Sequence, residues 1–358
     1  MRTRVIAVDP LAPDPAVIRT AGRLIRRGRL VAFPTETVYG LGANARGERA
    51  CARVFEAKGR PAEDPLIVHI ASVEAMAEVG REIPDVAWLL ATRFWPGPLT
   101  LVIKRSGRIP RGVSAGGDTV AVRLPAHPVA RALIEAAGCP IAAPSANRFG
   151  HVSPTRADHV RADLDGRIDL ILDGGPSPLG VESTVLDLTG PSPVVLRPGA
   201  VSIDQLREIV GCVTVATPSR QHAHSPGTAT RHYAPRARLE AFDGPGARDV
   251  AMARVRALLT EGHRVGVLAD DEFVADAPAA AIGTSLGQRN DSAAAARLLY
   301  GAMRHLDSLA VDVIVTVLPR DEGLGRAIRD RLNRAAEGRV IHVPALAAAG
   351  QERTPALG

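Results

Sequence analysis

Apolar and polar positions follow two different periods along the chain, and this pattern predicts an α/β protein. Apolar side chains recur every three or four positions from residue 14 to 28, which indicates a helix, and a short apolar run at 30–33 indicates a strand. Runs rich in valine, isoleucine and leucine predict further strands at 65–71, 99–104, 119–124, 140–143, 168–172, 183–188 and 194–196. Helical spacing lies between them at 50–57, 73–79, 85–94, 127–137 and 202–210. We therefore expect a domain with a large mixed sheet over residues 1–215.

The periodicity stops after residue 215 and restarts about twenty residues later. Residues 216–237 contain three prolines and no apolar period, which is typical of a linker. The pattern then predicts strands at 237–242, 264–269, 281–284, 313–317 and 339–343, with helices at 249–261, 292–309 and 324–336. This alternation indicates a smaller parallel, Rossmann-like α/β domain at 238–345, followed by a flexible tail at 346–358.

Composition excludes several classes of protein. With 358 residues, 46% apolar and 23% charged, the chain suits two folded domains and not a disordered or disulfide-stapled protein. Charged residues and prolines interrupt the first 18 residues, and no uncharged apolar run approaches 18 residues. We therefore expect a cytoplasmic protein with no membrane contact. Three separated cysteines, Cys51, Cys139 and Cys212, predict small buried side chains and no disulfide or metal site.

Positive charge is concentrated in the first part of the chain. Residues 1–150 hold 21 basic and 13 acidic side chains, whereas residues 151–358 hold 23 and 25. This bias fits an anionic ligand such as a nucleotide, or RNA, and a solvated surface would produce it equally well. Of the 44 basic residues 42 are arginine, so the two lysines, Lys58 and Lys104, indicate positions where a compact ammonium is needed.

The common motifs for phosphate, zinc and nucleophilic catalysis are missing from the sequence. Instead, Lys58 and Arg60 flank Gly59, where a helix is expected to end. Two cations at this spacing can project together from an extended turn and hold a polyphosphate. The alternative is a pair of solvated charges that favour a helix C-terminus.

Strand alternation brings a second set of polar residues together. Thr119, Ala121 and Arg123 share one face of the predicted strand, where a small alanine leaves room for a ligand and an arginine suits a carboxylate. Alternation also groups His69 with Ile67, although a hydrogen-bonded core histidine would fit that pattern.

Polar residues also follow several strands directly. Ser145 and Asn147 follow the strand at 140–143, Thr37 follows the strand at 30–33, and Ser183 and Arg197 lie at the ends of two more. Such residues are ordinary turn and cap formers, but polar groups crowded at strand ends also build ligand crevices in α/β sheets.

Tyr233, one of three tyrosines, lies in the linker. An aromatic residue there either docks on a neighbouring surface or closes over a ligand.

The order of these motifs resembles one family. The segments concerned are Phe33-Pro-Thr-Glu-Thr-Val-Tyr-Gly-Leu-Gly42, Lys58-Gly-Arg-Pro61, Pro65-Leu-Ile-Val-His69, Trp95-Pro-Gly-Pro-Leu-Thr100, Thr119-Val-Ala-Val-Arg123, Pro140-Ile-Ala-Ala-Pro-Ser-Ala-Asn147 and Gly180-Val-Glu-Ser-Thr184. Together they resemble the threonylcarbamoyl-AMP synthase (YrdC-like) family in its long, two-domain form. The resemblance implies a twisted mixed sheet with a concave ligand groove.

The resemblance also implies an activity. Family members convert L-threonine, bicarbonate or CO₂, and ATP with Mg²⁺ into L-threonylcarbamoyl-AMP and pyrophosphate. The product serves the N6-threonylcarbamoyladenosine modification of tRNA at position 37 through a downstream transferase complex. A tRNA- or double-stranded-RNA-binding module without turnover is the alternative, and weak RNA binding is compatible with both. An enzyme that processes carbamoyl phosphate would need cysteine-rich modules that this sequence lacks.

Site residues follow from the positions that match the family motifs. The triphosphate would be held by Lys58, Arg60, Ser145 and Asn147, the threonine by Thr37, His69, Arg123 and Ser183, and the rest of the ATP by Thr119, Ser153, Arg197 and Tyr233 with Asp64 and Ala143 nearby. No side chain is implied as a metal ligand, because Mg²⁺ would be held mainly by ATP. The linker departs from the family pattern: it reads Pro226-Gly-Thr-Ala-Thr-Arg-His-Tyr233 without the usual Met-Lys, which leaves Arg231 as the available cation.

Overall fold

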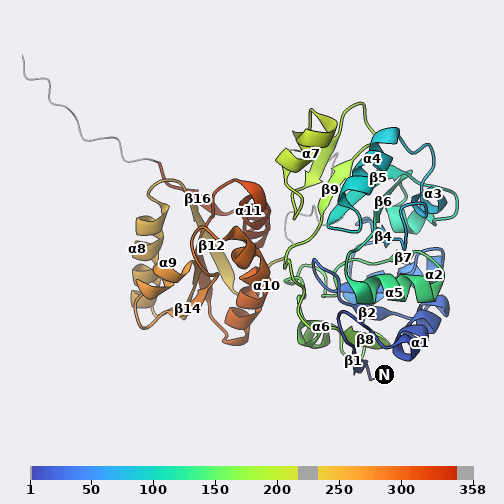
Figure 1. The fold of residues 1–358 in the computed structure, drawn as a ribbon. Coiled ribbons are helices and arrows are strands. Elements are labelled where there is room, and N and C mark those ends of the chain that lie inside the picture. The colour runs from blue at the N-terminus through green and yellow to red at the C-terminus, as the bar shows by residue number, and fades with distance from the viewer. Residues whose placement is uncertain (1, 217–232, 345–358) are drawn as a thin grey trace, which may run out of the picture.

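The N-terminal part of the chain is built on one twisted mixed sheet (Figure 1). The computed structural model describes residues 2–216 and 233–344. The sheet has the order β1-β8-β2-β3-β7-β4-β6-β5-β9-β10-β11. Its strands are β1 (Arg4–Ala7), β2 (Val31–Phe33), β3 (Gly40–Asn44), β4 (Ile67–His69), β5 (Leu99–Lys104), β6 (Thr119–Arg123), β7 (Ile141–Ala142), β8 (Leu170–Asp173), β9 (Thr184–Asp187), β10 (Val194–Arg197) and β11 (Thr214–Val215). Parallel and antiparallel pairs are mixed, as the sequence predicts.

Helices cover the sheet unevenly and leave part of one face free of helices. They are α1 (Pro15–Arg26), α2 (Glu48–Lys58), α3 (Met76–Val79), α4 (Asp85–Phe94), the 3₁₀ turn η1 (Arg111–Ser114), α5 (Pro128–Ala137), α6 (Ala157–Leu164) and α7 (Ile203–Val210). Helices α1 and α5 pack against Val31 and Phe33, whereas Ala32 faces the core shared with α2, α4 and α7. Alternate residues of β2 thus point into two different hydrophobic cores. Along β4 and β6, Ile67 and Ala121 belong to a separate small cluster on the face that holds the cavity described below.

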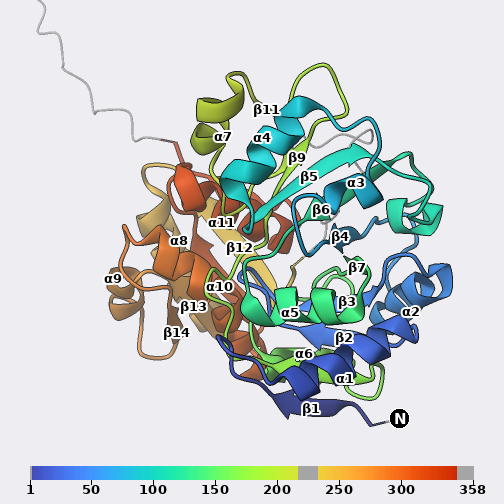
Figure 2. The ribbon, with the colours of Figure 1, turned by 45° about the vertical axis from the view of Figure 1, so that its right-hand side comes forward.

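The C-terminal part forms a second, wholly parallel sheet of order β14-β13-β15-β12-β16. Its elements are β12 (Arg238–Asp243), α8 (Ala247–Thr260), β13 (Val265–Ala269), α9 (Asp271–Ala275), β14 (Ile282–Ser285), α10 (Ser292–Ser308), β15 (Val313–Val317), α11 (Gly323–Ala335) and β16 (Val340–His342). Helices α10 and α11 lie on the side of this sheet that faces the N-terminal domain (Figures 1 and 2). One apolar cluster crosses the boundary and joins Val38 and Val181 to Tyr233, Leu299 and Leu332.

Several elements were not predicted from the sequence, and two of the three cysteines are less buried than predicted. Strands β1 and β3, helices α6 and α9, η1 and the short β11 were not predicted. β3 contains two glycines and no β-branched or aromatic residue, so its sequence does not indicate a strand. Cys51 is buried as predicted, but Cys139 is only half-buried, and Cys212 is exposed just after the Gly211 that ends α7. Most of the predicted linker, including the departure around Arg231, and the predicted tail lie outside the described residues.

Candidate active site

A small buried cavity lies where several strands of the N-terminal sheet end. Nine of the residues predicted for the site line it: Thr37, Arg60, His69, Arg123, Ala143, Ser145, Ser183, Arg197 and Tyr233. The same wall contains Thr35, Val38, Tyr39, Gly40, Ile67, Pro144 and Glu182. The structure therefore brings together motifs that are up to 196 residues apart in the sequence (Thr37 to Tyr233).

Arg123 is the cation at the end of β6, and three groups fix its guanidinium. Its Nη1 donates to Thr37 Oγ1 (2.9 Å), its Nε donates to the Gly97 carbonyl (3.2 Å), and its Nη2 lies 2.6 Å from Glu36 Oε1. The residue is only 3% exposed. A planar cation held in this way by buried partners is suited to orient a carboxylate ligand.

His69 ends β4, beside Arg123 in the parallel pair β4–β6. Burial, reinforced by the charge of Arg123, lowers the pKa of His69 from 6.5 to about 3, so the imidazole is neutral at physiological pH. Its Nδ1 has no hydrogen-bond partner among the described residues, and its ring meets Phe33 edge-on. A neutral imidazole on the cavity wall can exchange hydrogen bonds with a bound hydroxyl or amine.

Arg60 and Lys58 have separate partners and do not project together as the sequence suggested. Gly59 ends α2 with φ +63°, so the chain turns sharply between them. Arg60 lines the cavity, forms an ion pair with Asp64 Oδ1 (2.8 Å) and donates to the Pro65 carbonyl (2.7 Å). Lys58 does not line the cavity.

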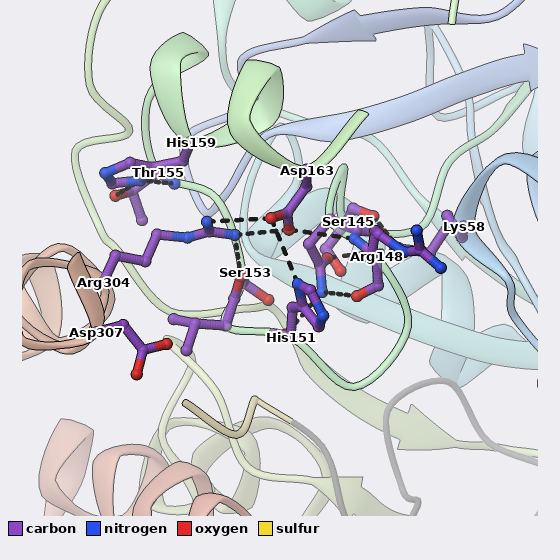
Figure 3. A network of polar contacts seen from close by, with 12 residues as sticks. Lys58, Ser145, Arg148, His151, Ser153, Thr155, His159, Asp163, Arg304 and Asp307 are labelled. Carbon is purple, nitrogen blue, oxygen red and sulfur yellow. Dashed lines mark hydrogen bonds and ion pairs between the residues drawn. The ribbon is translucent and has the colours of Figure 1, made fainter. Parts of the chain in front are cut away.

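Lys58 instead holds the loop that follows β7. Its ammonium, 2% exposed, donates to the backbone carbonyls of Ser145 and Asn147 (Figure 3). The Asn147 side chain in turn donates to the carbonyls of Arg148 (2.8 Å) and His151 (2.7 Å). Burial lowers the pKa of Lys58 well below its ordinary value of 10.5, and the nearby Arg60 lowers it further. A compact ammonium fits between two carbonyls, which explains a lysine in an arginine-rich chain.

Ser183 and Arg197 form the opposite wall. Arg197 Nη2 donates to the Ser183 carbonyl (2.9 Å) and contacts its hydroxyl (3.2 Å), and that hydroxyl lies 2.7 Å from Thr100 Oγ1. The close packing of this wall requires glycine at position 199, because a Cβ there would lie 2.3 Å from the Thr184 nitrogen. Arg197 therefore presents its charge to the cavity in a fixed orientation.

Tyr233 closes the cavity from the side of the C-terminal domain and is 1% exposed. Burial raises the pKa of its phenol, and the Glu182 carboxylate raises it further. Ser153, predicted beside the nucleotide, does not line the cavity; its hydroxyl donates to Glu182 Oε1 (2.6 Å). Glu182 thus connects the cavity wall to the Ser153 loop.

Three further predicted residues, Asp64, Asn147 and Thr119, do not line the cavity. Asp64 and Asn147 lie behind Arg60 and Lys58, and Thr119 starts β6, four residues from Arg123. Glu36 and Glu182 were not predicted as site residues from the sequence. Their signal was an acidic residue inside each of two polar strand-end motifs.

Cations dominate the cavity, and the acids beside it are already neutralised. Arg60, Arg123 and Arg197 line it, whereas Asp64 and Glu36 each form an ion pair with one of these arginines. Within residues 2–216 and 233–344 no group of three histidine, cysteine or acidic residues is placed to hold a metal ion. The described residues also include no helix that is long and apolar enough to cross a bilayer. The cavity therefore suits an anionic ligand with a carboxylate or phosphate group.

The fold and the cationic cavity at its strand ends define a small-molecule enzyme of α/β class. Two family models match in tandem: one described as "Telomere recombination" over residues 23–199, and one described as "Threonylcarbamoyl-AMP synthase, C-terminal domain" over residues 201–337. The chain belongs to the threonylcarbamoyl-AMP synthase family, whose members are enzymes that form an AMP-linked product.

Similar proteins agree over nearly the whole chain. The threonylcarbamoyl-AMP synthase of Pyrococcus abyssi is 47% identical over 91% of this chain and 96% of its own length. That of Bacillus subtilis is 44% identical over 94% and 98%. The crystal structure of P. abyssi Sua5 complexed with L-threonine superposes with a TM-score of 0.90 over 95% of this chain and all of that chain, at 45% identity. These comparisons confirm the predicted family, fold class and enzyme class.

Proposed function

We propose that the chain condenses L-threonine, CO₂ or bicarbonate, and ATP into L-threonylcarbamoyl-AMP and pyrophosphate inside this cavity. The observation that carries the proposal is the buried guanidinium of Arg123, aligned by Thr37, Gly97 and Glu36 and placed next to neutral His69. This arrangement recognises an amino acid by its carboxylate and leaves a hydrogen-bonding group for the hydroxyl. The similar P. abyssi protein was solved with L-threonine bound.

The reaction needs two bond-forming steps, and both depend on placement. The amine of threonine adds to the carbon of CO₂, loses a proton and becomes a carbamate. With bicarbonate as donor, the C–OH bond breaks and the amine proton leaves with that hydroxide as water. A carbamate oxygen then attacks the α-phosphorus of ATP in line, and the bond to pyrophosphate breaks. No covalent enzyme intermediate is needed, so the protein contributes alignment and charge.

We assign the cations of the cavity to the phosphates. Arg60 and Arg197 face the cavity, and Lys58 aligns the loop whose Ser145 lines it. Negative charge accumulates on pyrophosphate as it leaves, and fixed cations in a buried site stabilise that charge. Each such interaction is worth about 2–4 kcal/mol of the barrier. Ser183, Ala143 and Tyr233 would shape the space for the nucleotide and the threonine.

Mg²⁺ enters this scheme as part of the substrate Mg–ATP. The acids nearest the cavity, Glu36, Asp64 and Glu182, already neutralise arginines, so the described residues do not form a resident metal site. We therefore assign no side chain to the ion. We place the protein in the cytoplasm, with tRNA as the final acceptor through a downstream transferase complex.

Pyrophosphate release by the purified chain tests the proposal. With ATP, Mg²⁺, L-threonine and bicarbonate present, release should require threonine and yield a nucleotide with the mass of threonylcarbamoyl-AMP. Omission of each component in turn identifies the true substrates. Tight, salt-sensitive tRNA binding without threonine-dependent release would favour an RNA-binding module instead.

A further inference from the structure

Two side chains of the C-terminal domain reach the wall of the cavity and meet at Glu182. Arg331 of α11 donates from Nε to Glu182 Oε2 (2.7 Å), and Tyr300 of α10 donates its hydroxyl to the same oxygen (2.8 Å). Arg331 and Tyr300 are fully buried and Glu182 is 6% exposed. The other carboxylate oxygen, Oε1, accepts the hydroxyl of Ser153 (2.6 Å). One carboxylate therefore joins two domains to a loop of the nucleotide site.

The same two side chains also hold the ring of Tyr233. Tyr300 stacks on it with ring centroids 5.8 Å apart and planes inclined by 26°, and the Arg331 guanidinium carbon lies 5.2 Å from its centroid. Tyr233 has φ +61°, a left-handed conformation that a tyrosine rarely adopts. Such a backbone persists only where its surroundings impose it, and these ring contacts supply that constraint.

Close backbone packing also fixes the position of α10 against the segment 180–184. Gly180, two residues before Glu182, has φ +77°, and a Cβ there would lie 2.4 Å from the Ala296 carbonyl oxygen of α10. Any other residue would push α10 away from the 180–184 segment. Val181 packs in the apolar cluster that spans both domains. The position of Glu182 is thus tied to the positions of α10 and α11.

The polar groups at this contact are not explained by docking alone. Apolar packing is sufficient to join two domains, and a buried ion pair contributes little net stability because both charges lose water. Burial on its own opposes ionisation of Glu182, yet the charges of Arg331 and Arg197 hold its pKa below the usual range. Hydrogen bonds to a buried carboxylate fix geometry, and this network ends on Ser153 and Tyr233.

We propose that Arg331 and Tyr300 are positioning residues of the nucleotide site. They act through Glu182 on Ser153 and through ring contacts on Tyr233, so the C-terminal domain supplies the support for one wall of the cavity. A second link, from Arg304 of α10 to Asp163 (2.9 Å) and to the Val152 carbonyl, fixes the segment just before Ser153 (Figure 3). The inference rests on the proposed function, which places ATP beside these residues.

Two conservative variants test the inference. Tyr300→Phe keeps the stacked ring but removes the hydroxyl that donates to Glu182. Arg331→Lys keeps the charge but cannot bind Glu182, the Pro198 carbonyl (3.0 Å) and Asp330 (2.6 Å) from one planar fork. The control is Arg329→Lys, on the same helix, whose ion pair with Asp243 (2.6 Å) faces away from the interface.

The readouts are steady-state constants for ATP and threonine, and the Kd of α,β-methylene-ATP by calorimetry. We expect KM for ATP and this Kd to rise about tenfold in Tyr300→Phe and about ten- to hundredfold in Arg331→Lys, since each removes a hydrogen bond to a buried charge. KM for threonine should change less than KM for ATP. Arg329→Lys should match the wild type, and the Tm of Tyr300→Phe should stay within about 4 °C of that control.

The outcomes separate this inference from the proposed function. If the wild type releases no pyrophosphate with threonine but the two variants still bind the analogue more weakly than the control, the proposed function fails and the inference stands. If both variants bind the analogue as the control does, the inference is wrong, whatever the activity. A loss of Tm in Arg331→Lys leaves Tyr300→Phe as the deciding variant. Equal losses for ATP and threonine in a destabilised Tyr300→Phe would show a merely structural role and overturn the proposal.

Discussion

Replacing Arg123 by glutamine removes the charge that we assign to the threonine carboxylate. It also leaves the buried carboxylate of Glu36, which is 7% exposed, without the cation that lies 2.6 Å from it. An unpaired buried charge costs about 3–5 kcal/mol, a large part of the 5–15 kcal/mol that stabilises a typical domain. The single variant therefore confounds folding with binding, and it should show a strongly lowered Tm.

The double variant Glu36→Gln with Arg123→Gln separates the two effects. It removes both charges together, so the remaining cost is two hydrogen bonds, to Thr37 and Gly97, at about 1 kcal/mol each. Its free energy of unfolding should recover most of what Arg123→Gln loses. Threonine recognition should not recover: loss of a charge-assisted contact worth about 3–4 kcal/mol lowers kcat/KM for threonine about 100- to 1000-fold.

Arg105→Gln is the matched control. Arg105 is also a buried arginine that donates to backbone carbonyls, of Ser106 (3.2 Å), Ile109 and Gly117 (3.3 Å), but it does not line the cavity. It should lose stability and keep the wild-type KM for threonine. A double variant that folds as well as this control and still releases pyrophosphate with an unchanged threonine dependence would refute the role of Arg123.

Three further predictions concern the loop that contains Ser145, the stability of the protein at acid pH and the contact between Gly180 and α10. Lys58→Met should lower kcat about 100-fold or more in the pyrophosphate assay, because the Ser145 loop loses the ammonium that aligns it; activity at the wild-type level would contradict this role. His69 is protonated near pH 6.5 in the unfolded chain and only near pH 3 in the folded chain. Below pH 6.5 the unfolded state therefore binds a proton that the folded state does not. The contribution of His69 to the free energy of unfolding is complete above pH 6.5 and falls by up to about 1.4 kcal/mol per pH unit as pH decreases toward 3. Denaturant unfolding of His69→Gln should show a shallower acid loss than wild type, and parallel curves would count against a neutral buried His69. Gly180→Ala and its control Gly175→Ala both place alanine at positive φ, but only the alanine at position 180 would contact Ala296. The Tm of Gly180→Ala should therefore fall further than that of Gly175→Ala. Equal falls would contradict the close approach of Gly180 to α10.

Local pattern was enough to predict most of the scaffold. Val313–Val317 and Leu99–Lys104 are short runs rich in valine, isoleucine and leucine, and the structure has both strands at those bounds. Alternation also separated Ala121 from Val122, and the structure has Ala121 in a small cluster with Ile67 while Val122 lies in the main core. The sequence could not predict β3, where position 42 must be glycine because a Cβ there would lie 2.8 Å from the Phe33 ring. That constraint arises only after the strands have paired.

The site was predictable as a set of motifs, but the partners of its residues were not. Lys58 and Arg60 look alike as neighbouring cations, yet the turn at Gly59 directs them to different loops. Arg331 sits in a helix with many arginines, and nothing in its neighbourhood marks it as the buried partner of Glu182, 149 residues earlier. Contacts such as Arg331–Glu182 depend on how the two domains pack together, and the periodicity of a single helix or strand does not predict that packing.

The most direct test of the central account is the product formed by the wild-type chain and by Arg123→Gln/Glu36→Gln under the same conditions. With ATP, Mg²⁺, L-threonine and ¹³C-bicarbonate, the wild type should release pyrophosphate and form a ¹³C-labelled threonylcarbamoyl adenylate, detected by mass spectrometry. The double variant, shown to be folded by its melting curve, should form that product with a kcat/KM for threonine at least 100-fold lower than that of the wild type. Pyrophosphate release that ignores threonine, or a labelled product formed equally by both proteins, would contradict the account.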